Sequence, residues 1–209
     1  MSIEKTKLDR LAHWENVYSS KLNTDVSWFE AEPTTSLNVL EHILPQGGRI
    51  IDVGGGASFL VDRLVSKGTW EITVLDISST AIEYTNCRLG DAAAKVTWIC
   101  EDITETKKLK TYDVWHDRAV FHFLTNPIDR RAYLDRLQES LVSGGYFIVA
   151  TFAPDGPEKC SGLPVCRYSS EELVATLGSA YRTIATSQHD HLTPTGKIQR
   201  FTLAVFQML

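Results

Sequence analysis

The sequence predicts an α/β fold in which a doubly wound, mostly parallel β-sheet carries helices on both faces. Along its 209 residues, short apolar runs of strand length alternate with segments of helical period, which is typical of such sheets. The apolar run at residues 49–53 leads directly into Gly54, Gly55 and Gly56, as expected for a strand, a tight turn and a helix start. The last two apolar runs alternate with polar residues, which favours an antiparallel pair at one edge.

The composition is that of an ordinary soluble domain. Hydrophobic residues make up 43% of the chain and charged residues 22%, which excludes disordered and fibrous classes. We expect one domain over residues 1–209. Within it, residues 1–45 are predicted to form a helical lid or brace, 46–151 a cofactor-binding core, and 152–209 a substrate-side loop, helix and terminal hairpin.

Charge and cysteine usage narrow the possible partners. A net charge of −5 argues against a nucleic-acid backbone as the main partner. The first ten residues lack the apolar core of a signal peptide and no later run reaches membrane-spanning length, so we expect a cytoplasmic protein without a membrane partner. The four cysteines lack a paired spacing, which predicts reduced thiols and no metal site.

The N-terminal part predicts two helices around a loop. Residues 3–22 place apolar side chains at three- and four-residue steps, so this segment is predicted to be an amphipathic helix lying on the rest of the protein. The loop after it carries Trp28 and Phe29, a pair that needs a partner or a ligand. A helix over residues 35–44 follows Pro33.

In the middle of the chain, helix signals separate short apolar runs. A helix at 59–67 is closed by Gly68, and Thr80 with Glu83 predicts a capping box that starts the next helix. Asn126 before a proline predicts the start of a longer helix, which continues toward Gly144. The runs between these helices are the predicted strands, at 71–75, 96–100, 112–116 and 146–151.

The last quarter predicts a helix and a hairpin. Residues 153–168 form a long loop that borders the site, and Ser169 with Glu172 caps a helix that ends at Gly178. The final strands are predicted at 182–188 and 199–207. His189 and His191 would then lie in a solvated connection between them; the alternative is a metal site that uses both rings.

Acidic residues stand where several of the predicted strands end. In a doubly wound sheet, ligands bind outside the carboxyl ends of the strands, so these acids are expected to share one site. Asp76, about twenty residues past the glycines, suits a pair of ribose hydroxyls, and the alternative is that it caps the following helix. Asp102 can accept from the exocyclic amine of adenine, with Ile77 and Ile103 against the ring; the alternative is that it is a turn residue. The four acids are Asp52, Asp76, Asp102 and Asp117.

These motifs resemble those of the class I S-adenosylmethionine-dependent methyltransferases. Their first motif is an apolar strand ending in acid-x-Gly-x-Gly, here Asp52 to Gly56, and their ribose and adenine acids match Asp76 and Asp102. The usual Pro-Gly-Gly before the fifth strand is Ser-Gly-Gly here, and Ser58 stands where a glycine is common. The resemblance implies a Rossmann-like sheet of seven strands with the last antiparallel, and S-adenosylmethionine as cofactor, leaving S-adenosylhomocysteine.

The N-terminal segment carries a second, shorter resemblance. Trp14, Tyr18 and Trp28 lie in a pattern similar to that of a subgroup that includes seven-strand lysine methyltransferases. In that subgroup the segment folds over the cofactor. The resemblance therefore implies that these three aromatic residues contact the cofactor.

Candidate catalytic residues follow the fourth predicted strand. The family places groups that touch the methionine end of the cofactor or the target atom at the position of Asp117; alternatively, Asp117 caps a turn. Arg118 could pair with the cofactor carboxylate or with a substrate anion. His122 is a candidate general base, with a core histidine as the alternative.

The predicted function is transfer of a methyl group from S-adenosylmethionine to a small-molecule N, O or S nucleophile. A protein-lysine methyltransferase is the alternative acceptor class. Two alternatives of other classes are a nicotinamide-dependent oxidoreductase and a protein that binds the cofactor without catalysis. The sequence makes no prediction of the oligomeric state.

Overall fold

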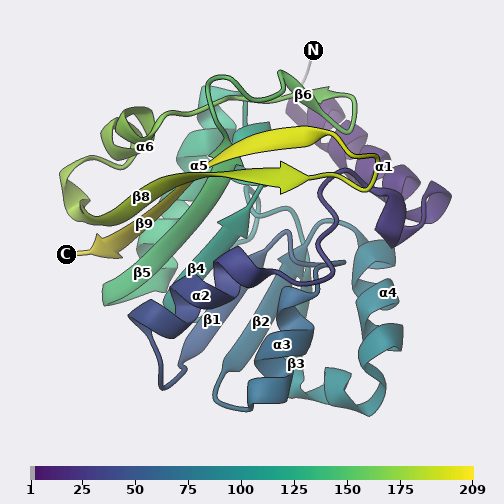
Figure 1. Ribbon diagram of the computed structural model, residues 1–209, viewed down its shortest axis with the longest axis horizontal. Helices are drawn as coiled ribbons and strands as arrows, with labels where there is room; N and C mark the ends of the chain where they lie inside the picture. Colours follow the sequence, from purple (N-terminus) through teal and green to yellow (C-terminus); the bar gives the residue numbers. More distant parts are fainter. Residues whose placement is uncertain (1–2) are drawn as a thin grey trace.

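The computed structural model describes residues 3–209, with side chains from residue 9 onward, and its centre is a seven-stranded sheet (Figure 1). The strand order is β3-β2-β1-β4-β5-β9-β8, with β1 to β5 parallel and β9 antiparallel to both of its neighbours. The predicted fold class, seven strands with an antiparallel end, is confirmed. The strands are β1 (Arg49–Val53), β2 (Glu71–Asp76), β3 (Val96–Cys100), β4 (Tyr112–Arg118), β5 (Leu141–Phe152), β8 (Tyr181–Leu192) and β9 (Ile198–Met208).

Helices cover both faces of the sheet, because successive side chains of each buried strand point to opposite sides. Ile51 and Trp115 pack on the side of α5 and α6, whereas Ile50 and Val114 pack on the side of α2 and α3. The helix α1 lies apart from both layers, beside α4 (Figure 1). The helices are α1 (Ile3–Ser20), α2 (Thr34–Ile43), α3 (Leu60–Lys67), α4 (Ser79–Leu89), α5 (Pro127–Ser140) and α6 (Ser170–Leu177).

Several predicted boundaries are confirmed at their capping residues. Gly68 ends α3 in the left-handed region with φ of 70°, and Asn126 accepts from the backbone N–H of Ile128 at the start of α5. Ser169 and Glu172 form both bonds of a capping box at α6. Short polar side chains at helix starts therefore predicted these boundaries correctly.

The predicted capping box at Thr80 is wrong. The N-cap of α4 is Ser78, whose hydroxyl accepts from the backbone N–H of Ala81. The hydroxyl of Thr80 instead donates to Glu15 of α1. A tertiary contact with α1 takes the side chain that the local pattern assigned to the cap.

The final hairpin is longer than predicted, and the histidines are placed differently. His189 and His191 lie within β8, paired with Phe201 and Gln199 of β9, rather than in a solvated connection. The ring of His191 is buried, with Nε2 2.8 Å from the carbonyl oxygen of Ser27. The hairpin extends because β9 offers ladder partners well beyond the stretch where the sequence alternates.

The segment after β5 forms a small two-stranded unit, β6 (Lys159–Cys160) with β7 (Leu163–Pro164). It follows the carboxyl end of β5, so it borders the site as the sequence analysis expects. Along the described part of the chain, no helix combines the length and apolar character needed to cross a bilayer. The cytoplasmic location stays a prediction.

Candidate functional site

The glycine turn after β1 brings backbone and carboxylates into close contact. Gly54 adopts φ of 74°, and a Cβ there would lie 2.1 Å from a methyl carbon of Val120. A Cβ on Gly56 would lie 2.7 Å from Oδ2 of Asp76, the atom that accepts from the Gly56 N–H at 2.9 Å. Glycine is therefore required at both positions, by backbone conformation at the first and by close approach at the second.

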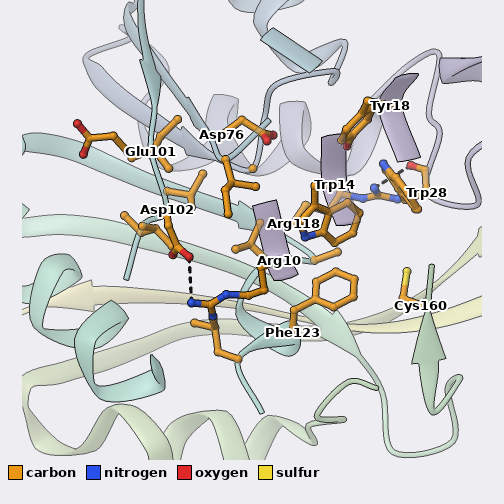
Figure 2. A pocket seen from close by; sticks show the side chains of 18 residues that line it. Arg10, Trp14, Tyr18, Trp28, Asp76, Glu101, Asp102, Arg118, Phe123 and Cys160 are labelled. Carbon is orange, nitrogen blue, oxygen red and sulfur yellow. Dashed lines mark hydrogen bonds and ion pairs between the residues drawn. The ribbon is translucent and has the colours of Figure 1, made fainter. Parts of the chain in front are cut away.

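The first cavity lies at the carboxyl ends of the parallel strands and spans about 780 Å³, including open solvent at its mouth (Figure 2). The strands supply Asp76 and Arg118, α1 supplies Arg10 and Trp14, and the β6–β7 unit supplies the buried thiol of Cys160. Burial raises the pKa of that thiol to about 11, so it is a neutral wall near pH 7. The cavity thus has strand ends as its floor and α1 as its cover.

One end of the first cavity is lined by acids. Asp76 is 5% exposed and accepts from the backbone N–H groups of Gly56 and Ser78. Burial raises its pKa to about 6, although the two N–H groups oppose this. Asp102 accepts from the backbone N–H and hydroxyl of Thr104 through Oδ1. Its Oδ2 lies 2.9 Å from the guanidinium of Arg10 (Figure 2).

Two charged side chains hold α1 in place over this end. Arg10 pairs with Asp102 and, at 3.1 Å, with Asp129 at the start of α5. Glu15 accepts from the backbone N–H of Ser79 at 2.6 Å and from the hydroxyl of Thr80 at 2.5 Å, at the positive end of α4. These contacts join α1 to elements on both sides of the cavity.

The other end of the first cavity is aromatic. The ring of Trp14 packs edge-on against Trp28 and Phe123, with centroid separations of 5.8 and 5.0 Å, and Tyr18 packs edge-on against Trp28 at 6.2 Å. Such pairs contribute about 0.5–1.5 kcal/mol each beyond burial of their area. All four rings line the cavity, where they gather around Arg118 (Figure 2).

A second cavity, with about 570 Å³ of empty space, adjoins the first on the side of the glycine turn. Tyr18, Trp28, Gly54 and Arg118 line both cavities. The second also includes two acids, Asp52 and Glu30, and residues of the turn and of α2 and α3. Together the cavities form one elongated space that runs from Asp102, past Gly54, to Glu30.

Arg118 and Glu30 form a half-buried ion pair at 2.8 Å where the two cavities meet. Arg118 also donates to the carbonyl of Trp28, and Glu30 lies 3.4 Å from Nδ1 of His191. Burial lowers the pKa of Arg118, although Glu30 opposes this. Burial alone would raise the pKa of Glu30, but its hydrogen bond with His191 and the charge of Arg118 lower it overall. The pair fixes the Trp28 loop against β4 and β8.

Asp117 and His122 do not line either cavity. Asp117 has no exposed surface and accepts from the backbone N–H groups of Val120 and Phe121 and from the hydroxyl of Tyr133. Burial raises its pKa to about 6. His122 is equally buried, its Nδ1 accepts from the Phe152 N–H, and burial lowers its pKa to about 3. The capping role for Asp117 and the core role for His122 describe this geometry better than catalysis.

Most of the other predicted site residues lie together. Gly56 lines neither cavity but orients Asp76 through its N–H. The predicted residues that line one or both cavities are Trp14, Tyr18, Trp28, Asp52, Gly54, Gly55, Asp76, Ile77, Asp102, Ile103 and Arg118.

Several polar residues of the site are not among the residues predicted from the sequence. Arg10 has the pattern of an ordinary solvent-facing helix residue, and Glu101 is one of two adjacent acids after β3. Ser36 and His116 carry no local signal, because strand pairing brings His116 beside Asp52 and the packing of α2 brings Ser36 beside His116. Glu30 stands beside the aromatic pair that the sequence analysis singled out, which is the one signal that could have found it.

A family model and several known proteins are similar to this chain. Residues 51–147 match the family model described as a methyltransferase domain. The structure resembles that of Burkholderia thailandensis 1,6-didemethyltoxoflavin-N1-methyltransferase, with a TM-score of 0.79 and 16% identity, over 100% of this chain and 91% of that one. At that identity the likeness concerns the fold.

Sequence relatives differ in their acceptors. Malonyl-[acyl-carrier protein] O-methyltransferase of Anoxybacillus flavithermus is 30% identical over 54% of this chain and 42% of its own length. The tRNA U34 carboxymethyltransferase of Vibrio atlanticus is 29% identical over 68% of this chain and 44% of its own length. EEF1A lysine methyltransferase 2 of Danio rerio is 26% identical over 70% of each.

The chain therefore spans less than half the length of the first two relatives. The matched residues 51–147 contain the strand, glycine turn and following acids of this chain, on its seven-stranded sheet with an antiparallel end. The chain therefore carries a match to a methyltransferase domain over residues 51–147, and its fold is similar to that of a solved methyltransferase.

Proposed function

We propose that this protein transfers the methyl group of S-adenosylmethionine to a small-molecule nucleophile. The observation that carries the proposal is the covered cavity. Arg10, Trp14 and Tyr18 of α1 line it on one side and Cys160 on another, so the aromatic end of the first cavity lies under the N-terminal helix. A compact acceptor fits such a site better than a macromolecular surface does.

The residues present fit the proposed cofactor. Asp76 offers a buried carboxylate to ribose hydroxyls, and Ile77 and Ile103 offer apolar contact to adenine near Asp102. The second cavity offers Asp52 to the amino group of the methionine part, since Oδ2 of Asp52 is buried and has no hydrogen-bond partner among the described residues. When bound, the sulfonium supplies an electrophilic methyl carbon.

The chain itself contributes orientation and exclusion of water. The rings of Trp14, Trp28 and Phe123 form an apolar wall next to the glycine turn, which favours an in-line approach of a nucleophile over water. Arg118 pairs with Glu30 and can be shared with an anionic group of the ligand or the acceptor. We propose that Asp117 and His122 support this wall from behind rather than exchange protons with the acceptor.

The nature of the acceptor is the finer part of the proposal. The net charge of −5 favours a small molecule over the tRNA on which the Vibrio relative acts. Protein lysine is the second candidate, because the lysine methyltransferase aligns over 70% of both chains. The methyltransferase domain match leaves no observation in favour of a nicotinamide-dependent reaction.

Methyl-labelled S-adenosylmethionine, incubated with the protein and a fractionated cell extract, tests the acceptor class. We expect label in the small-molecule fraction, because the cavity lies beneath α1. Label in protein would support the lysine alternative, and label in RNA would contradict the charge argument. The matched control is the Asp76→Asn variant, which keeps the size of the side chain and removes the carboxylate.

We expect the affinity for S-adenosylhomocysteine to rise as the pH increases through about 6. The ionised carboxylate of Asp76 accepts from ribose hydroxyls, whereas the protonated form, which predominates below its pKa of about 6, has lost one acceptor oxygen. Calorimetric titration between pH 5 and 7.5 measures this change. In the Asp76→Asn variant the affinity should no longer change with pH in this range. If this variant kept the pH profile of the unaltered protein, the assignment of Asp76 to the ribose would be contradicted.

A further inference from the structure

Three buried polar side chains form a hydrogen-bonded row beside the second cavity. Oδ1 of Asp52 lies 2.7 Å from Nδ1 of His116, and Nε2 of the same ring lies 2.8 Å from the hydroxyl oxygen of Ser36. The three residues are 3%, 4% and 6% exposed. The proposed function uses only Asp52, so the roles of the histidine and the serine need another account.

The row results from strand register. Asp52 of β1 and His116 of β4 are direct partners in the parallel ladder, and both side chains point to the face covered by α2. Ser36 stands in the first turn of α2, above them. Three separate elements therefore meet at one imidazole ring.

The hydrogen bonds define which atoms are occupied. A carboxylate has no proton to give, so Nδ1 of His116 donates to Asp52, and Nε2 is bonded to the Ser36 hydroxyl. Both ring nitrogens are thereby fixed and the ring cannot rotate without breaking a bond. One oxygen of Asp52 is committed to the ring.

The other oxygen of Asp52 is left for a ligand. Oδ2 is buried without a partner among the described residues, directly beneath the glycine turn, since a Cβ on Gly55 would lie 2.2 Å from it. An unpaired buried carboxylate oxygen costs free energy, and a cationic donor relieves that cost. The cavity lined by Asp52 and Gly55 gives such a donor access.

We propose that His116, held by Ser36, is a positioning residue that turns the free oxygen of Asp52 toward the amino group of the cofactor's methionine part. The inference rests on the proposed function and extends it to His116 and Ser36. The same order of groups occurs in Ser-His-Asp hydrolases. Here the atom without a partner is Oδ2 of Asp52, whereas the Ser36 hydroxyl is bonded to His116. This indicates a role in binding a ligand rather than nucleophilic attack by Ser36.

Two ligands that differ only in the amino-acid part test the proposal. S-adenosylhomocysteine carries the amino group, and 5′-methylthioadenosine has the same ribose and adenine without it. In the His116→Gln variant we expect the affinity for S-adenosylhomocysteine to fall about tenfold or more, because an amide at the Nε2 position loses the bond to Asp52. The affinity for 5′-methylthioadenosine should stay within twofold.

Matched variants separate positioning from a general effect on folding. The amide of Asn reaches the position of Nδ1, so His116→Asn should restore most of the affinity for S-adenosylhomocysteine. Ser36→Ala keeps the bond between His116 and Asp52 but frees the other side of the ring. It should lower the affinity for S-adenosylhomocysteine alone, by a smaller factor than His116→Gln does. Thermal unfolding of each variant shows that the chain is folded.

Equal losses for both ligands, or no loss in any variant, would overturn the positioning role while leaving the proposed function intact. Labelling of Ser36 by a fluorophosphonate probe would also overturn it, because it would make the row nucleophilic. If the unaltered protein bound neither ligand, the proposed function would fail together with the inference. The calorimetric comparison therefore distinguishes the two failures.

Discussion

The Asp76→Ala variant is expected to lose at least about two orders of magnitude in affinity for S-adenosylhomocysteine. Asp76 is the buried carboxylate at the acidic end of the first cavity, and two hydroxyl groups of a ribose can donate to it. A hydrogen bond to a charged group contributes about 1.5–3 kcal/mol, so the loss of two amounts to about 3 kcal/mol or more. Calorimetric titration measures the loss directly.

This variant should lower the affinity for 5′-methylthioadenosine as strongly as that for S-adenosylhomocysteine, because both ligands contain the ribose. Asp113→Ala is the matched control: Asp113 lies in β4 and pairs with Arg49 at 2.8 Å, away from both cavities. It should leave the affinity unchanged. An Asp76→Ala variant that remains folded and binds with normal affinity would refute the ribose assignment.

The Trp14→Ala variant is expected to lower kcat/KM for methyl transfer at least tenfold. Its ring is the centre of the aromatic wall, in contact with Tyr18, Trp28 and Phe123. Without it, water enters next to the position of the reacting methyl and the cover over the cavity loses its main apolar contact. Cofactor affinity should fall as well, which titration measures alongside the rate.

Leu11→Ala is the control on the same helix, since the Leu11 side chain is 39% exposed and lines neither cavity. We expect it to keep both rate and affinity. If Trp14→Ala behaved like Leu11→Ala, the role of α1 as a cover would be wrong.

Local sequence patterns predicted the fold class and the position of the site well. The glycine turn after β1 needs its residues for steric reasons that any sequence must respect, and the acids at strand ends meet because parallel strands end at one edge. Trp14 and Trp28 belong to one N-terminal pattern, and both line the first cavity. Signals that are local, or that depend on strand direction alone, can therefore be recognised without coordinates.

Signals that depend on strand length and register could not be recognised. β4 extends two residues beyond its predicted end, so Asp117 lies inside the strand. Successive side chains of a strand alternate between faces, which sends Asp117 toward Tyr133 of α5 and His116 toward Asp52. The predicted residue Asp117 is therefore the chain neighbour of His116, which lines the second cavity.

The contact between His191 and the loop that carries Trp28 has a consequence for the order in which the protein matures during synthesis. The His191 ring meets the carbonyl of Ser27 across 164 residues of sequence, and it also approaches Glu30. The ribosome therefore releases the aromatic residues of this loop long before the hairpin that anchors them. A nascent chain that already holds its parallel strands still lacks this anchor, and the Trp28 side of the two cavities is completed only when the last two strands join the sheet.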